Sequence, residues 1–299
     1  MKRGIWIRCL LGGFLLAASA PLAAQPAYRG EPRLFRHEIQ LQAYLFNNFF
    51  QARGGAPEED VRAAGVEYGV AYRREENAPD FFGALYAINY AHEGTKTTFG
   101  GRIGGSYYGS RHSFYGYLDH MQNGWAFDVE ETTANADITA LLALYSYRVH
   151  PDWQVGLNGY NEWLSFDVDT GYEGDYYQME GEVRYRGFGS ILEPRIGYAV
   201  GRRNVENDRD SYDHRHWFVE LSTEPHPNVD LSARYRRRTR DYRTVEREED
   251  RPQIRVRAVF RHNERISWIM QIIREDVDSS LPGRDFETSR VFAGVMLGF

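Results

Sequence analysis

Apolar side chains alternate with polar or small ones along most of this chain. The clearest run covers residues 291–299, where every second residue is apolar: Val291, Ala293, Val295, Leu297 and Phe299. This spacing places the five side chains on one face of a β-strand. The same alternation predicts fourteen strands, at residues 37–47, 63–73, 82–92, 98–108, 113–121, 138–149, 153–167, 176–188, 192–202, 216–223, 229–242, 253–261, 266–276 and 286–299. Most have the roughly 9–11 residues that a tilted strand needs to cross a bilayer.

The connections between these strands alternate in length. Six are short, at residues 75–80, 109–111, 150–152, 189–191, 224–228 and 262–264, and those between them are mostly longer and polar. Short turns at one end and longer loops at the other are typical of membrane barrels. We therefore predict an all-β fold, a transmembrane antiparallel β-barrel of about 14 strands. Twelve or sixteen strands remain open, because strands three to six are rich in Gly and Tyr and alternate weakly.

Composition favours the same class. Aromatic residues make up 15% of the chain although the mean hydropathy is −0.59, a combination that suits lipid-facing strands around a polar interior. A soluble β-sandwich would expose this aromatic surface to water. No apolar run after residue 24 approaches eighteen residues, which excludes spanning helices. The net charge of −6 and the lack of a nucleic-acid-binding motif exclude nucleic acid as a partner.

The first residues have the pattern of a secretory signal peptide. Lys2, Arg3 and Arg8 precede a short apolar run, and small residues follow up to Ala24. We expect a signal peptide at 1–24, a short periplasmic segment at 25–36 and a barrel domain at 37–299. Cys9 is the only cysteine, so the mature chain would have no disulfide and no cysteine metal site. We expect no cofactor.

The last strand resembles the C-terminal insertion signal of Gram-negative outer-membrane β-barrels. Val295, Leu297 and Phe299 match its alternating apolar face, with Phe299 as the terminal aromatic residue. The resemblance implies a porin-like protein of the cell outer membrane. It also implies three partners, namely the barrel assembly machinery, outer-membrane lipid and lipopolysaccharide.

Arginines gather on the face opposite the apolar one in the C-terminal half. Of the 36 basic residues, all but Lys2 and Lys96 are arginine. The inward-facing candidates are Arg184, Arg186, Arg195, Arg234, Arg236, Arg238, Arg255, Arg257 and Arg261. Guanidinium groups bind carboxylate, sulfate or phosphate bidentately, and a pore lined with them concentrates anions. The pattern therefore predicts a channel for small or oligomeric anionic solutes, such as acidic saccharides. It is compatible with the channel part of a polysaccharide export system.

Three other interpretations compete with the channel. Inward arginines and glutamates often cross-link strands without touching a solute, which would suit a non-conducting structural or surface-interaction barrel, and some arginines could bind lipopolysaccharide. An enzyme is disfavoured. Residues 118–125 resemble a stretch of outer membrane phospholipase A at His120, Asn123 and Gly124, but Gln122 stands where the serine nucleophile is required. His214 and His216 could touch a metal, although isolated histidines more often serve as polar lumen residues. We expect no metal site and no catalysis.

Overall fold

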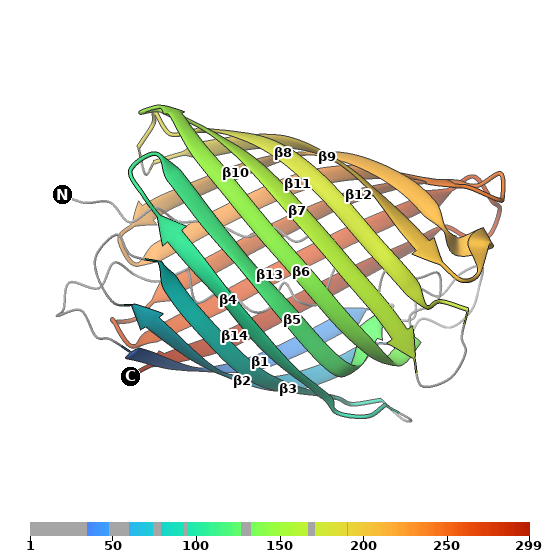
Figure 1. Cartoon of the computed structure of the whole chain (residues 1–299), viewed down its shortest axis with the longest axis horizontal. Helices are drawn as coiled ribbons and strands as arrows, with labels where there is room; N and C mark the ends of the chain where they lie inside the picture. The colour runs from blue at the N-terminus through green and yellow to red at the C-terminus, as the bar shows by residue number, and fades with distance from the viewer. Residues whose placement is uncertain are drawn as a thin grey trace.

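The chain folds into a closed antiparallel barrel (Figure 1). The computed structural model describes residues 35–47, 60–73, 79–92, 95–126, 133–166, 171–189 and 191–299. Each strand pairs with its neighbours in the chain, and β1 pairs with β14. The strands are β1 (Phe35–Asn47), β2 (Val61–Arg73), β3 (Asp80–Tyr90), β4 (Thr98–Tyr108), β5 (His112–Ala126), β6 (Thr133–His150), β7 (Trp153–Phe166), β8 (Gly174–Tyr185), β9 (Glu193–Val205), β10 (Tyr212–His226), β11 (Val229–Tyr242), β12 (Glu248–Arg261), β13 (Ile266–Ser279) and β14 (Phe286–Gly298). The predicted count of fourteen is confirmed.

Some predicted segments lie outside the described residues. They are the signal peptide at 1–24 and all of the segment 25–36 except its last two residues, which begin β1. The short 3-10 helix η2 (Asp208–Asp210) connects β9 to β10. No helix within the described ranges is long and apolar enough to cross a membrane.

The outer face of the barrel is apolar. Each of β1 to β13 exposes at least one large apolar side chain: Leu41, Val66, Leu85, Ile103, Leu118, Leu141, Leu157, Met179, Ile196, Val219, Leu231, Val256 and Met270. Residues between them on the same strands are mostly buried, as the two-residue period requires. A closed barrel with an apolar exterior is the form in which strands cross a bilayer, because every backbone polar group is paired. The protein is therefore built for the outer membrane.

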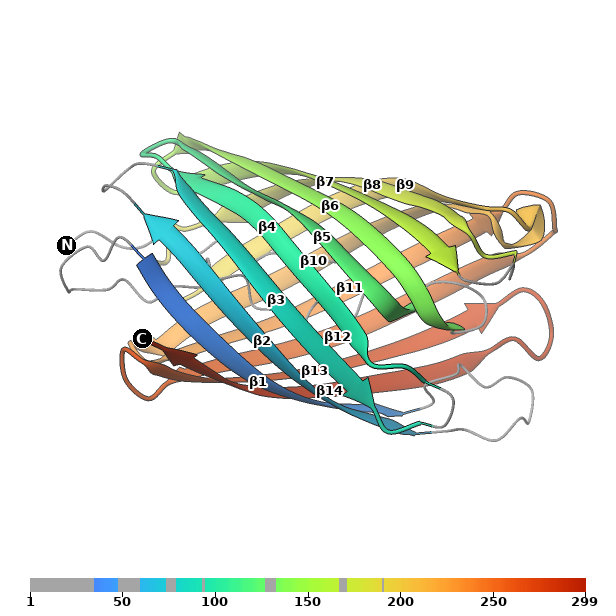
Figure 2. The same ribbon diagram turned by 60° about the horizontal axis from the view of Figure 1, so that its bottom comes forward.

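The barrel closes where the last strand meets the first. Leu297 pairs with Ile39, and the backbone N–H of Phe299 donates to the carbonyl of His37 at 3.0 Å. Phe299 is 51% exposed. The beginning of β1 and the end of β14 lie at one end of the barrel, here called the terminal end, and the opposite end is called the far end (Figure 2).

Four strands extend at one end by four or more residues beyond the predicted bounds, and several others by two or three. Residues 122–126, 133–137, 212–215 and 248–251, which we expected to lie in loops or between strands, belong to β5, β6, β10 and β12. Toward the far end the outward-facing residues of β9 to β12 are charged. Arg237 pairs with Asp250 at 2.7 Å, and Arg202 pairs with Asp213 at 2.6 Å. Cross-strand ion pairs replace the apolar face there, so hydrophobic alternation does not reveal these ends.

Glycines facing aromatic rings explain the weak alternation of the middle strands. A Cβ atom at Gly100 would lie 2.1 Å from Cζ of Tyr86, its direct partner on β3. A Cβ atom at Gly104 would lie 2.5 Å from Cζ of Phe82, its direct partner on β3. In both cases a ring from the neighbouring strand covers the glycine, so the strand is regular although its sequence lacks a large residue there.

The orientation of the barrel gives a first testable prediction. Epitope tags inserted at residues 206–207 or 244–245, at the far end, should bind antibody on intact cells. Tags at residue 151 or at 227–228, in turns at the terminal end, should bind only after permeabilisation. The reason is that outer-membrane barrels place their termini and short turns in the periplasm. Heat-modifiable migration would verify that each tagged barrel folds, and the opposite labelling would show that the orientation is inverted.

Candidate functional site

The nine arginines named from the sequence lie on neighbouring strands. Arg184 is on β8, Arg195 on β9, and the others on β11 and β12, except Arg186, which follows β8 directly. Seven are buried, whereas Arg186 and Arg257 are half-buried. Residues at alternate positions, such as Tyr235 and Ile254, are exposed on the outside. The arginine side chains on the strands therefore face the barrel interior. Sequence reasoning did not single out three further arginines on the same wall: Arg203, Arg251 and Arg290.

We call this surface the arginine wall. It consists of the inward-facing arginines of β8 to β14: Arg184, Arg195, Arg203, Arg234, Arg236, Arg238, Arg240, Arg251, Arg255, Arg257, Arg261 and Arg290. On β11 and β12 alone, eight inward arginines accompany two inward carboxylates, Asp230 and Glu249. Positive charge therefore exceeds negative charge along these two strands.

The strand register places like charges side by side. Arg234 is the direct partner of Arg255, and Arg238 is the direct partner of Arg251. Like charges at directly opposite positions destabilise a strand pair. By contrast, Arg240 faces Glu249, the arrangement expected of a structural ion pair.

Carboxylates from neighbouring strands are shared among the arginines. Arg195 and Arg255 both contact Oε2 of Glu220, at 3.2 Å and 3.0 Å. Arg234 approaches Oε2 of Glu180 at 3.4 Å, and His216 Nε2 reaches the same oxygen at 3.1 Å. Aromatic rings also stack against some of these guanidinium groups.

Two of these stacking contacts are close. The Arg234 Cζ atom lies 3.6 Å from the centroid of the Phe218 ring, and Arg240 Cζ lies 4.3 Å from that of Tyr212. Stacking on an aromatic face leaves the N–H edge of a guanidinium group for hydrogen bonds in its own plane. The rings thus orient the arginines without consuming their donors.

Glu275 on β13 is the most heavily shared carboxylate. Arg236, Arg238, Arg251 and Arg290 each lie 3.5–3.6 Å from one of its oxygens. These arginines come from β11, β12 and β14, and Glu275 is 1% exposed. The sequence indicates only that Glu275 faces inward, because it lies in the same alternating phase of β13 as the polar residues Ser267 and Gln271.

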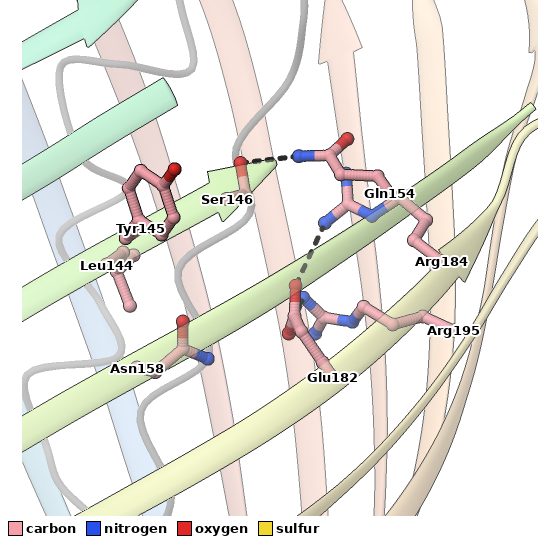
Figure 3. Close-up of a pocket in the computed structure, with 8 residues that line it drawn as sticks. All are labelled: Leu144, Tyr145, Ser146, Gln154, Asn158, Glu182, Arg184 and Arg195. Atoms are coloured by element: carbon pink, nitrogen blue, oxygen red, sulfur yellow. Dashed lines mark hydrogen bonds and ion pairs between the residues drawn. The ribbon is translucent and has the colours of Figure 1, made fainter. Parts of the chain in front are cut away.

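A small cavity lies beside the arginine wall near the terminal end (Figure 3). Its volume is about 20 Å³, enough for about one water molecule. Arg184, Glu182, Arg195 and Gln154 line it, and Gln154 donates to the Ser146 hydroxyl at 2.5 Å. Figure 3 shows Arg184 and Arg195 on either side of Glu182. Polar groups therefore surround the cavity on several sides.

Arg186 lies at the terminal end of the barrel, directly after β8. It lies 3.8 Å from Glu193. Burial lowers the pKa of the Arg186 guanidinium, and the Glu193 carboxylate opposes that shift. An arginine stays charged in either case.

The opposite wall of the interior is aromatic and apolar. One buried cluster extends over β3 to β8, with Tyr86, Tyr115, Tyr117, Tyr160 and Tyr176 among its members. The interior therefore has two chemically distinct sides, an arginine wall and a tyrosine wall. Buried ion pairs also lie beside the tyrosine wall: Arg102 contacts Asp119 at 2.6 Å, and Arg203 contacts Glu162 at 2.9 Å.

Arginines on the outside of the barrel are arranged differently. Arg202, Arg215, Arg237 and Arg274 each lie within 4 Å of a carboxylate on the adjacent strand, namely Asp213, Asp241, Asp250 and Glu287. Arg215 with Asp241 and Arg237 with Asp250 are one-to-one pairs. Asp213 also contacts Arg243 at 3.5 Å, so two arginines share a carboxylate there, compared with four around Glu275 on the inner face.

The histidines of the enzyme and metal interpretations also have defined places. His120 faces outward and contacts Thr139 Oγ1 at 2.9 Å. His214 faces inward and contacts the Tyr176 hydroxyl at 3.0 Å. Within the described ranges, no group of three or more His, Cys, Asp or Glu residues is arranged to hold a metal ion.

Comparison with known proteins identifies the fold class. No known protein family and no curated protein sequence matches the chain. A structure described as a bacterial polysaccharide outer membrane secretin matches with a TM-score of 0.55 and 10% identity, over 88% of this chain and 98% of that one. A deletion mutant of the monoaromatic hydrocarbon channel TodX matches with a TM-score of 0.53 and 10% identity, over 90% and 91%. This chain is a closed outer-membrane β-barrel of the porin-like type. At such low identity the similarity extends to the fold alone.

Proposed function

We propose that this barrel is a passive channel that prefers anionic solutes. The observation that carries the proposal is the charge arrangement on β11 and β12, where Arg234 faces Arg255 and Arg238 faces Arg251. A network that served only to hold strands together would place carboxylates opposite the arginines, because like pairs are destabilising. A pore that concentrates anions needs the surplus positive charge.

The outside of the barrel supplies the comparison for the competing structural interpretation. Arg237 and Arg215 are matched with Asp250 and Asp241, so this chain does form one-to-one ion pairs where they link strands. The arginine wall departs from that pattern. The strand number supports a channel as well, because side chains fill barrels of about eight strands, whereas those of sixteen leave an aqueous pore.

Acidic saccharides are the solute class that fits the arginine wall. Guanidinium groups bind carboxylates bidentately, whereas Arg102, beside the tyrosine wall, is already paired with Asp119. The likeness to a polysaccharide secretin supports this choice as an analogy of fold only. In this proposal residues 118–125 form no acyl-transfer site, since Gln122 cannot act as a nucleophile.

Conductance in planar bilayers tests the proposal. The purified protein should conduct with anion preference, and the preference should weaken in 1 M salt, where the screening length falls to roughly 3 Å. The triple substitution Arg234→Gln, Arg236→Gln and Arg255→Gln should lower the anion preference while the barrel still folds, because lumen substitutions mainly tune selectivity.

Arg237→Gln is the matched control. It removes one positive charge from the outer face of β11, so its selectivity should equal that of the wild type, whereas Arg234→Gln or Arg236→Gln alone should lower the anion preference. A barrel that inserts without conducting would defeat the channel and favour the structural role. A cation-selective pore would support the channel function but would show that the arginines do not determine its selectivity. The structural role would be supported if the triple variant failed to fold while each of its three single substitutions folded with the selectivity of the wild type.

A further inference from the structure

Glu275 occupies the place at which four guanidinium groups converge. Arg236 and Arg238 reach it from β11, Arg251 from β12, and Arg290 from β14. The residues lie toward the far end of the barrel, since Arg251 and Arg290 follow shortly after the far-end starts of β12 and β14. Four positive groups around one carboxylate leave a net positive site on the inner wall.

The contact lengths show that Glu275 is shared and that no single arginine holds it tightly. Its distances of 3.5–3.6 Å exceed the 2.7–2.9 Å typical of charge-assisted hydrogen bonds. Arg102 and Asp119 in the same barrel lie at 2.6 Å. A carboxylate held loosely by several guanidinium groups is well suited to exchange with another carboxylate.

We propose that Glu275 is a built-in occupant of a solute-binding site, which the carboxylate of an acidic saccharide displaces during passage. Arg290, whose side chain is 12% exposed, is the most accessible of the four arginines. This inference rests on the proposed channel function and gives it a location.

A displaceable occupant solves a problem that every selective channel faces. Binding has to be favourable enough for a solute to enter and weak enough for it to leave. Four arginines without an anion would hold a carboxylate strongly. Glu275 competes with the solute for the same donors, so it shortens the time that the solute stays bound.

Block of chloride current by a short oligogalacturonate tests this role. Glu275→Gln keeps the shape of the side chain and removes its charge, so the concentration for half block should fall by about tenfold or more. Glu287→Gln is the matched control, because Glu287 lies near the far end of the neighbouring strand β14 and its ion pair with Arg274 is on the outer face. Its half-block concentration should equal that of the wild type. A neutral maltooligosaccharide of the same length should be unaffected by either change.

A second variant covers the case in which Glu275→Gln fails to fold. Arg290→Gln removes one donor and should raise the half-block concentration several-fold, whereas Arg274→Gln on the outer face should not. If a folded Glu275→Gln or Arg290→Gln barrel had the half-block concentration of the wild type, the proposed role of Glu275 would be wrong. The channel proposal would still stand as long as the wild-type barrel prefers anions. A wild-type barrel without anion preference would instead overturn the channel proposal itself.

Discussion

Replacement of Asp119 by alanine is expected to destabilise the barrel by about 3–5 kcal/mol, because it breaks a buried ion pair from one side. Asp119 is 1% exposed, and its Oδ2 atom accepts from Nη2 of Arg102 at 2.6 Å and from Nε at 3.1 Å. Its other oxygen accepts from the Tyr86 hydroxyl at 2.8 Å. The substitution leaves the buried guanidinium beside apolar and aromatic groups without this carboxylate. Urea unfolding of the protein in lipid vesicles, followed by tryptophan fluorescence, would measure the loss.

The double variant Arg102→Met with Asp119→Leu distinguishes the contribution of the ion pair to stability from the contribution of side-chain packing. Replacing both partners of a buried pair by apolar residues of similar volume is often neutral or stabilising, so this variant should unfold at a urea concentration close to that of the wild type. Arg102 and Asp119 are direct partners on β4 and β5, so both new side chains would meet in the same place. Equal losses in the single and double variants would mean that packing, and not the unpaired charge, is what Asp119 provides.

The strand pattern was predictable because one physical constraint acts at every position. Lipid on the outside and polar groups on the inside require alternation, so the sequence alone indicated fourteen strands. Where that constraint is absent, prediction failed. Toward the far end the outer face meets polar surroundings, and ion pairs such as Arg237 with Asp250 take over, which is why Arg251 was assigned to a loop.

The inward phase of the arginines could be predicted, but their partners could not. The convergence on Glu275 depends on the register of β11, β12, β13 and β14 relative to one another. A period of two residues fixes the face of a strand and not its offset from the next strand. Glu275 was thus visible only as one polar residue on a strand, and the direct pairing of Arg234 with Arg255 was not visible at all.

Replacement of Leu297 by aspartate, or of Phe299 by alanine, is expected to remove most of the protein from the outer membrane. Both residues belong to the stretch that resembles the insertion signal read by the assembly machinery. The folded barrel itself would lose little, because a charge on the lipid face near the interface costs about 0–1 kcal/mol. The amount of heat-modifiable protein in outer-membrane fractions measures the effect.

Ile39→Asp is the matched control for this prediction. Ile39 is the direct partner of Leu297, so the new charge has the same face and nearly the same depth, but it lies on the first strand. If recognition of the last strand governs assembly, Ile39→Asp should retain most of the protein in the membrane while Leu297→Asp does not. The purified Leu297→Asp chain should still fold into detergent or lipid without the assembly machinery. Equal losses for Ile39→Asp and Leu297→Asp, or failure of Leu297→Asp to fold in vitro, would assign the defect to the closure of β1 on β14 and would remove Leu297 from the insertion signal.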